Sequence, residues 1–193
     1  KDSMYTSRFF LACALLAGSG LLTWAPALQA QTSAGASAER KPGLAVCYLY
    51  KLVRHVDEIE TWAKSLPCEP GAVLANLDFY GGSGVVLTSK ADDGVLARIS
   101  GFVHLDKPGA YKFAFESNDG VRLKIDGKMI VEDPGVHDDQ FSDLGTMEVT
   151  TPGWYPIAVD FFERRVTWTL RLLWRPPGVD GDLAPVPAAA LAH

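Results

Sequence analysis

The strongest constraint on the fold is the alternation of apolar and polar residues in the chain that follows Gly71. The alternation recurs in four segments, at residues 111–116, 121–126, 155–161 and 168–174. A period of two places the apolar side chains on one face of a strand. A single antiparallel sheet cannot bury such faces, so they must pack against another sheet. The pattern therefore predicts a mainly β protein, an antiparallel β-sandwich.

One short helix is expected before these strands, directly after a first strand at residues 44–50. Apolar residues recur at three- or four-residue spacing from Leu52 to Ala63, and Pro67 ends the pattern. This spacing predicts an amphipathic helix of about three turns.

The first thirty residues have the features of a secretory signal peptide. Arg8 precedes an apolar run at residues 9–22, and small residues follow as far as Ala30. A membrane anchor is the alternative, but the run is shorter than a spanning helix and Pro26 follows it closely. We therefore expect an exported protein, periplasmic or at the cell surface, whose only membrane contact is the uncleaved signal segment.

Composition divides the rest of the chain into three parts. Residues 31–42 are rich in Ser, Ala and Gly, which is typical of a flexible linker. Residues 43–178 carry the strand and helix patterns and form the expected β-sandwich binding domain. Residues 179–193 contain Pro, Gly and a run of three Ala without an aromatic anchor, and we expect a flexible tail.

The composition argues against two classes of function. The net charge of -5 disfavours nucleic-acid binding, which needs a basic face. The chain contains none of the common nucleotide-binding, serine-hydrolase or zinc-protease motifs, and its four histidines are scattered. We therefore expect a protein that is not an enzyme.

The cysteines that follow the signal segment predict a disulfide. Removing residues 1–30 leaves Cys47 and Cys68, an even pair in an exported chain. Closing the loop between them stabilises the fold by about 3 kcal/mol in the chain-entropy model. A metal site or a reactive thiol is the alternative, but the chain has no CxxC and no His at ligand spacing.

A set of short motifs in a fixed order resembles the PA14 (protective-antigen-type) domain family. The resemblance is densest at residues 94–175 and is weaker at the strand near residue 44. It implies a β-sandwich, in agreement with the alternation. The motifs are Pro108–Phe113, Ser117–Leu123, Ile125–Lys128, Pro152–Ile157, Asp160–Glu163 and Leu170–Trp174.

The resemblance also implies a site. In lectin members of the family, two adjacent Asp residues joined by a cis peptide bind Ca²⁺, and the ion binds sugar hydroxyls. The matching positions are Asn118 and Asp119, which become the expected metal ligands, and Glu163 and Arg164 complete the expected ligand-binding set. The chain departs from the family pattern at Asn118, which replaces an Asp, and in a short turn that carries Arg164 and Arg165. The alternative is that Asn118 and Asp119 only form the turn that ends a strand.

Other polar and aromatic groups are weaker candidates. The pair Arg164 and Arg165 suits an anionic sugar, an acidic partner or simply a solvated hairpin tip. A second metal cluster is the less favoured interpretation of the acidic loop at residues 137–143. The tryptophans can stack on sugar rings but are more typical of a core. The remaining candidates are Asp92–Gly94 as a turn, His137–Asp139 with Asp143 as the acidic loop, and Trp154, Trp168 and Trp174.

Together these features predict an exported, non-catalytic binding module. The leading hypothesis is a carbohydrate-binding module whose partner is a glycan, with or without the assistance of Ca²⁺. The alternative is a non-lectin structural or interaction module that binds a protein of an envelope or surface assembly.

Overall fold

The computed structural model describes residues 39–193. The predicted signal peptide and residues 31–38 of the predicted linker lie outside this range. Within residues 39–193, no helix combines the length and the hydrophobicity that a membrane span requires.

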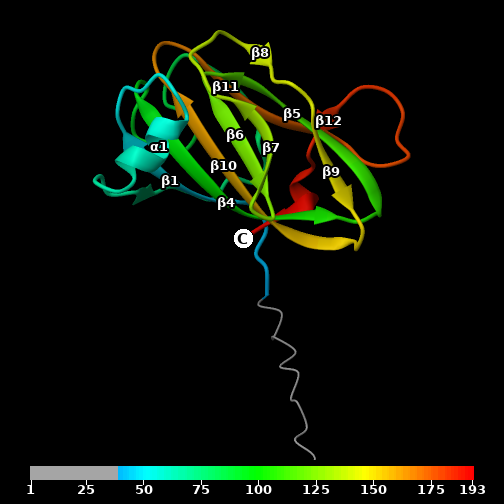
Figure 1. The fold of residues 1–193 in the computed structure, drawn as a ribbon. Helices are drawn as coiled ribbons and strands as arrows, with labels where there is room; N and C mark the ends of the chain where they lie inside the picture. The colour runs from blue at the N-terminus through cyan, green and yellow to red at the C-terminus, as the bar shows by residue number, and fades with distance from the viewer. Residues whose placement is uncertain (1–38) are drawn as a thin grey trace, which may run out of the picture. The chain divides into compact units, whose positions relative to one another are not determined.

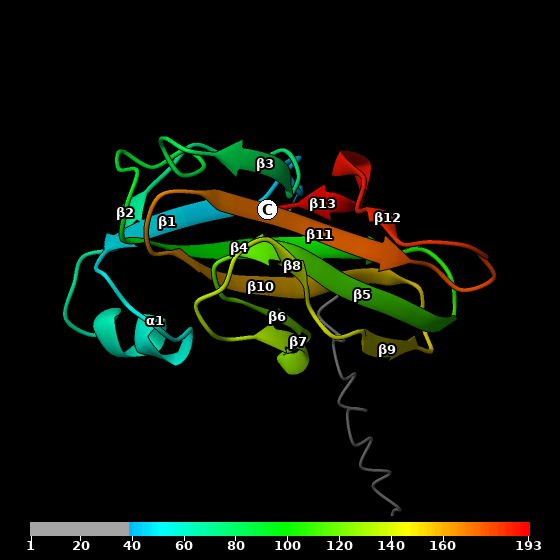
Figure 2. The ribbon, with the colours of Figure 1, turned by 90° about the horizontal axis from the view of Figure 1, so that it is seen from above.

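The described chain folds into two packed antiparallel sheets (Figures 1 and 2). The seven-stranded sheet runs in the order β2 (Glu69–Pro70), β1 (Ala45–Tyr50), β4 (Val95–Leu105), β10 (Gly153–Glu163), β6 (Val121–Ile125) and β7 (Lys128–Asp133), with β13 (Leu191–Ala192) paired to β4. The six-stranded sheet runs in the order β12 (Ala184–Pro185), β11 (Trp168–Arg175), β5 (Gly109–Asn118) and β8 (Gln140–Phe141), with β3 (Asp78–Gly82) paired to β11 and β9 (Gly145–Val149) paired to β5.

The core lies between the sheets and is made by the alternating residues. Phe113 and Phe115 of β5 and Leu123 of β6 are fully buried in one apolar cluster, together with Phe161 of β10 and Leu170 of β11. Strands from opposite sheets therefore bury their apolar faces against each other, as the period of two requires. The predicted β-sandwich is confirmed.

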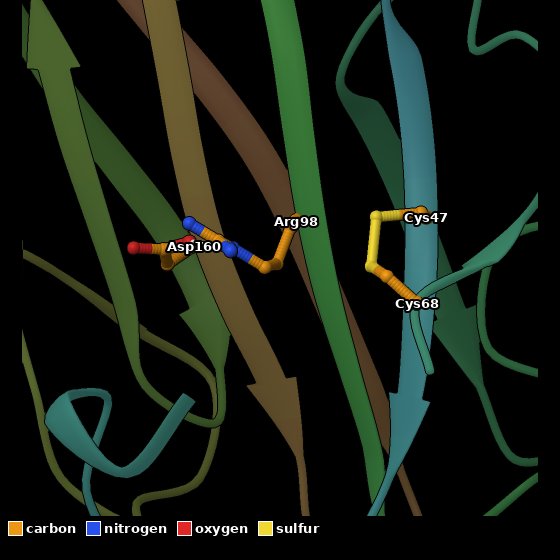
Figure 3. Close-up of a disulfide and its surroundings, with 4 residues drawn as sticks. All are labelled: Cys47, Cys68, Arg98 and Asp160. Carbon is orange, nitrogen blue, oxygen red and sulfur yellow. Dashed lines mark ion pairs between the residues drawn. A yellow bond between two sulfur atoms is a disulfide. The ribbon is translucent and has the colours of Figure 1, made fainter. Parts of the chain in front are cut away.

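The disulfide joins the first strand to the segment that follows the helix (Figure 3). Cys47 of β1 is bonded to Cys68, which directly precedes the short edge strand β2. The predicted pairing is confirmed. On β4 and β10 beside it, Arg98 and Asp160 face each other, with Nε and Oδ1 3.5 Å apart.

The helix α1 (Asp57–Trp62) is shorter than the sequence pattern predicts. The amide of Val56 donates a hydrogen bond to the carbonyl of Pro134 at 3.0 Å, so it cannot donate to residue 52 as a continuous helix would require. Leu52 is 46% exposed. The apolar face that remains, Val56 and Ile59, packs in a second cluster with Phe162 on the outer side of the seven-stranded sheet. A tertiary hydrogen bond thus replaces the first turn.

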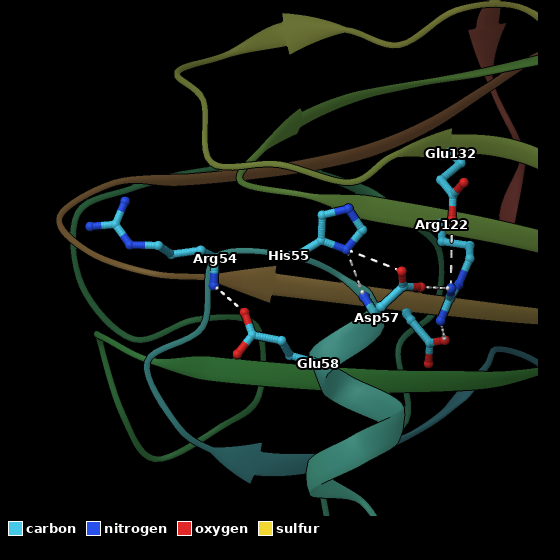
Figure 4. A network of polar contacts seen from close by, with 7 residues as sticks. Arg54, His55, Asp57, Glu58, Arg122 and Glu132 are labelled. Carbon is cyan, nitrogen blue, oxygen red and sulfur yellow. Dashed lines mark hydrogen bonds and ion pairs between the residues drawn. The ribbon is translucent and has the colours of Figure 1, made fainter.

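A buried arginine anchors α1 to that sheet (Figure 4). The side chain of Arg122, on β6, is 6% exposed and bonds to Asp57 Oδ1 at 2.8 Å and Asp160 Oδ2 at 3.0 Å. Glu132 Oε1 of β7 lies 3.5 Å from the same guanidinium. A buried charge is tolerated only when it is paired, and this network pairs it with three carboxylates from three elements.

The C-terminal residues are part of the fold, so the prediction of a flexible tail at 179–193 is wrong. Val186 and Leu191 are buried in the main core, and β13 pairs with β4. The backbones of Lys41 and His193 exchange two hydrogen bonds, of 2.9 and 2.8 Å. The physical reason is that the aliphatic side chains of Val186 and Leu191 are buried in the core, so no aromatic anchor is needed.

Candidate functional site

Three loops meet at one end of the sandwich and enclose a hollow of about 510 Å³. They are the turn between β5 and β6, the loop between β7 and β8, and the hairpin between β10 and β11. The hollow is lined by Asn118, Asp119, Val136, His137, Asp138, Arg164, Arg165, Val166 and Thr167. The structure therefore brings together three of the four predicted ligand-binding residues, Asn118, Asp119 and Arg164, on one surface.

Asp119 fastens the three loops to one another. The peptide bond between Asn118 and Asp119 is cis, as the resemblance implies. The Asp119 carboxylate accepts the amide of His137 at Oδ1, at 3.1 Å, and the amide of Arg164 at Oδ2, at 2.7 Å. Burial raises the pKa of Asp119, and these two hydrogen bonds act against that rise. Its carboxylate thus holds one loop on each side of its own turn.

The neighbouring residues complete this turn. Asn118 donates from Nδ2 to Thr167 Oγ1 at 3.1 Å, which ties the turn to the β10–β11 hairpin. At Gly120 a Cβ atom would lie 2.5 Å from the ring of Phe162 and 2.8 Å from the carbonyls of Pro134 and Gly135. Only glycine fits this close approach of two backbones.

The turn that contains Asp92 and Asp93, predicted before a strand, also braces the β10–β11 hairpin through Asp93. Asp93 Oδ1 accepts the amide of Val166 at 2.9 Å, and the amide of Gly94 donates to the carbonyl of Arg164 at 3.2 Å. Val166 itself has a φ of 79°, which is unusual for a β-branched residue. Sequence analysis missed this role, because the two partners are 73 residues apart in the chain.

Glu163 does not line the hollow, although it was predicted to bind ligand. Its side chain is fully buried, and both carboxylate oxygens lack a hydrogen-bond partner. Burial, followed by the negative charges of Asp93 and Asp119, raises the pKa of Glu163 to about 7. The side chain is therefore a buried acid next to the site and offers no oxygen to a ligand in the hollow.

The two arginines of the hairpin line the hollow. Arg164 is half-buried, and Arg165 is exposed. Among residues 39–193, neither guanidinium forms an ion pair, and Nε of Arg164 is buried without a partner. The hollow thus contains hydrogen-bond donors that no protein group occupies.

This donor set does not fit calcium. Ca²⁺ takes six to eight oxygen ligands, usually with several carboxylates among them. Across residues 39–193, no three His, Cys, Asp or Glu side chains are grouped so that they could hold a metal ion. Both oxygens of Asp119 already accept backbone amides, and the two guanidinium groups in the same hollow repel a cation.

The other candidates lie apart from this site or are structural. His137 Nε2 lies 3.4 Å from Asp133 Oδ1, and only His137 and Asp138 of the acidic loop reach the hollow, so the second metal cluster does not form in the described chain. Trp168 is 6% exposed in the main core. The rings of Trp154 and His104 contact each other in a tilted arrangement, and Trp174 packs against the core, both away from the hollow.

The sequence profile of the PA14 domain matches residues 60–186. The match covers 127 of the 193 residues. The chain belongs to the PA14 domain family. The resemblance found in the motif order is confirmed, and the β-sandwich agrees with this family. No curated protein sequence matches the chain.

Solved structures, among them two PA14 domains, share this fold at low sequence identity. The PA14 domain of the antifreeze protein MpAFP superposes with a TM-score of 0.65 at 15% identity, over 81% of this chain and 93% of that one. The PA14 sugar-binding domain from an RTX adhesin gives 0.61 at 15% identity, over 79% and 99%. The epithelial adhesin 6 A domain from Candida glabrata, solved in complex with Galβ1-3GlcNAc, gives 0.61 at 13%, over 80% and 88%. The chain spans 47% of the length of a similar anti-sigma factor domain-containing protein.

Proposed function

We propose that this PA14 domain is a non-catalytic carbohydrate-binding module that binds saccharide in the three-loop hollow. The observation that carries the proposal is the lining of the hollow. Arg164 and Arg165 offer donors, and Asp138 offers acceptor oxygens. Val136 and Val166, which are 46% and 71% exposed, offer apolar surface. Sugars require this mixture, because their hydroxyls both donate and accept while their C–H faces are apolar.

The solved relatives support the same function. The PA14 domain of the RTX adhesin is described as sugar-binding, and the Candida glabrata adhesin domain was solved with a galactoside. The disulfide fits an exported protein, because such bonds persist in oxidising compartments. We therefore place the module outside the cytoplasm, in the periplasm or at the cell surface.

We further propose that saccharide binding does not need Ca²⁺. If Ca²⁺ bound the hollow, CaCl₂ at about 100 times the dissociation constant would stabilise the fold by about 2.7 kcal/mol. Because the hollow lacks a suitable oxygen set, thermal melts in CaCl₂ and in EDTA should coincide. A rise in Tm in CaCl₂ that disappears in Asp119→Asn would contradict the proposal.

The function itself is tested by a glycan array. The purified mature protein should bind a defined group of saccharides in EDTA, and Arg164→Gln should weaken that binding. A protein that binds no saccharide on the array, with or without CaCl₂, would refute the carbohydrate-binding function.

A second candidate is an interaction module in an envelope or surface assembly. Phe141 of β8 and Leu144, just before β9, favour it. These two apolar side chains are close in the chain and are 63% and 60% exposed, so they offer apolar surface to a partner. Cross-linking in the native envelope tests this candidate. It predicts a specific partner that is lost when Phe141 and Leu144 are changed to Ser, whereas Arg164→Gln should leave that partner bound.

A further inference from the structure

We propose that the hollow selects an anionic saccharide, one that carries a carboxylate such as a uronic or sialic acid, and that Arg164 and Arg165 bind this carboxylate. The inference rests on the proposed carbohydrate binding at this hollow and adds the chemical class of the sugar.

The backbone of Arg164 is fixed before any ligand arrives. Its amide donates to Asp119 Oδ2 at 2.7 Å, and its carbonyl accepts the amide of Gly94 at 3.2 Å. The next residue but one, Val166, is held by Asp93. Arg164 and Arg165 therefore project from a hairpin whose backbone is fastened on both sides, so the backbone loses little freedom when a ligand binds.

Arg164 differs from the other buried or half-buried arginines, because their guanidinium groups have partners in the described chain and that of Arg175 donates to the carbonyl of Gly181. Arg122 has carboxylate partners on three elements, and Arg171 bonds to Asp78 at 2.7 Å and to Glu116 at 2.5 Å. Arg164 is half-buried, but no carboxylate among residues 39–193 pairs with it. A partly desolvated guanidinium without an anion is unfavourable, and a ligand carboxylate supplies that anion.

The acidic groups near the hollow leave this charge available. Asp119 directs both oxygens to backbone amides, and Asp93 directs one oxygen to Val166. Glu163 is buried away from the ligand, with a pKa of about 7. Asp138 is the one exposed carboxylate in the lining of the hollow, and it can accept hydroxyls from the rest of the sugar.

The chemistry of the donors favours a carboxylate. A guanidinium presents two parallel N–H groups that match the two oxygens of a carboxylate, and such charge-assisted pairs are about twice as strong as neutral hydrogen bonds. A neutral sugar hydroxyl can also accept from these donors, but it lacks the negative charge that adds the attraction of an ion pair. The hollow should therefore discriminate between an acidic saccharide and its neutral parent.

The test is a glycan array of matched pairs, in which each saccharide with a uronic or sialic acid stands beside its neutral parent. The best acidic ligand is then titrated by calorimetry in EDTA. We expect it to bind at least about tenfold more tightly than its neutral parent, with an advantage that shrinks as salt increases. Arg164→Gln and Arg165→Gln should each remove most of that advantage, and Arg164→Lys should retain part of it.

The matched control is Lys128→Gln, which removes one positive charge at the exposed β6–β7 turn, at the far end of β6 from Asn118. It should bind like the native protein, and thermal melts verify that every variant is folded. If neutral parents bind as tightly as acidic ligands, or if the arginine variants keep the preference, the selection is overturned while carbohydrate binding stands. If no saccharide binds, both proposals fail.

Discussion

Glu163 has the most unusual environment of any side chain near the site. It is fully buried, its oxygens have no partner, and it lies near Asp93 and Asp119. A carboxyl with a folded pKa of about 7, well above its ordinary value of 4.5, is protonated in the native state and ionised in the unfolded state between these two pH values. Its contribution to stability is therefore complete below about pH 4.5 and is lost as the pH rises through about 7.

We predict that Glu163→Gln abolishes this pH dependence. The difference in pKa corresponds to about 3 kcal/mol, so the native protein should lose about that much free energy of unfolding between pH 4.5 and pH 8 relative to the variant. Urea unfolding at a series of pH values measures the difference. Glu148→Gln, at an exposed position on β9, is the control and should follow the native curve. Parallel curves for the native protein and Glu163→Gln would show that Glu163 ionises normally.

At the scale of the elements, the β10–β11 hairpin is held by carboxylates from two other turns. Asp119 binds the amide of Arg164, and Asp93 binds the amide of Val166. The site residues are thus placed by contacts between segments that are far apart in the sequence. Local sequence predicted β5, β6, β10 and β11 well, because the alternation of a half-buried strand is a local signal. It did not reveal the role of Asp93, because nothing in an Asp-Asp-Gly turn specifies a partner 73 residues away.

We predict that Asp93→Ala loosens the hairpin. Loss of one hydrogen bond to a backbone amide should cost about 1 kcal/mol and should speed hydrogen exchange at the amide of Val166. Asp92→Ala is the matched control, since it removes the adjacent carboxylate without breaking this bond. Equal exchange rates at Val166 in the two variants would contradict the bracing role.

At the scale of the whole molecule, the sandwich is completed by its last residues. The sequence did not predict this, because a run of Ala and Pro has no periodicity, and only the packed fold shows the space that these small side chains fill. The helix was overestimated for a related reason, since the hydrogen bond from Val56 to Pro134 depends on the assembled fold. Of the predicted site residues, Asn118, Asp119 and Arg164 line the hollow, whereas Glu163 is buried.

We predict that Leu191→Ala destabilises the protein by about 2–5 kcal/mol, because it removes a buried side chain and leaves a cavity. Val179→Ala should change stability by less than about 0.5 kcal/mol, because Val179 is 45% exposed. Thermal and urea unfolding of the two variants provide the comparison. A loose tail would instead give two equally small effects.

The paired backbones of Lys41 and His193 have a practical consequence. Both residues lie beside the middle of β4, near Phe102, whereas the three-loop hollow lies past the end of β4 at Val95. The stretch of β4 from Phe102 to Val95 spans about 23 Å. A tag or carrier fused before residue 41 or after residue 193 should therefore leave the hollow unobstructed, so the domain can be immobilised by either end and still present its arginines to solution.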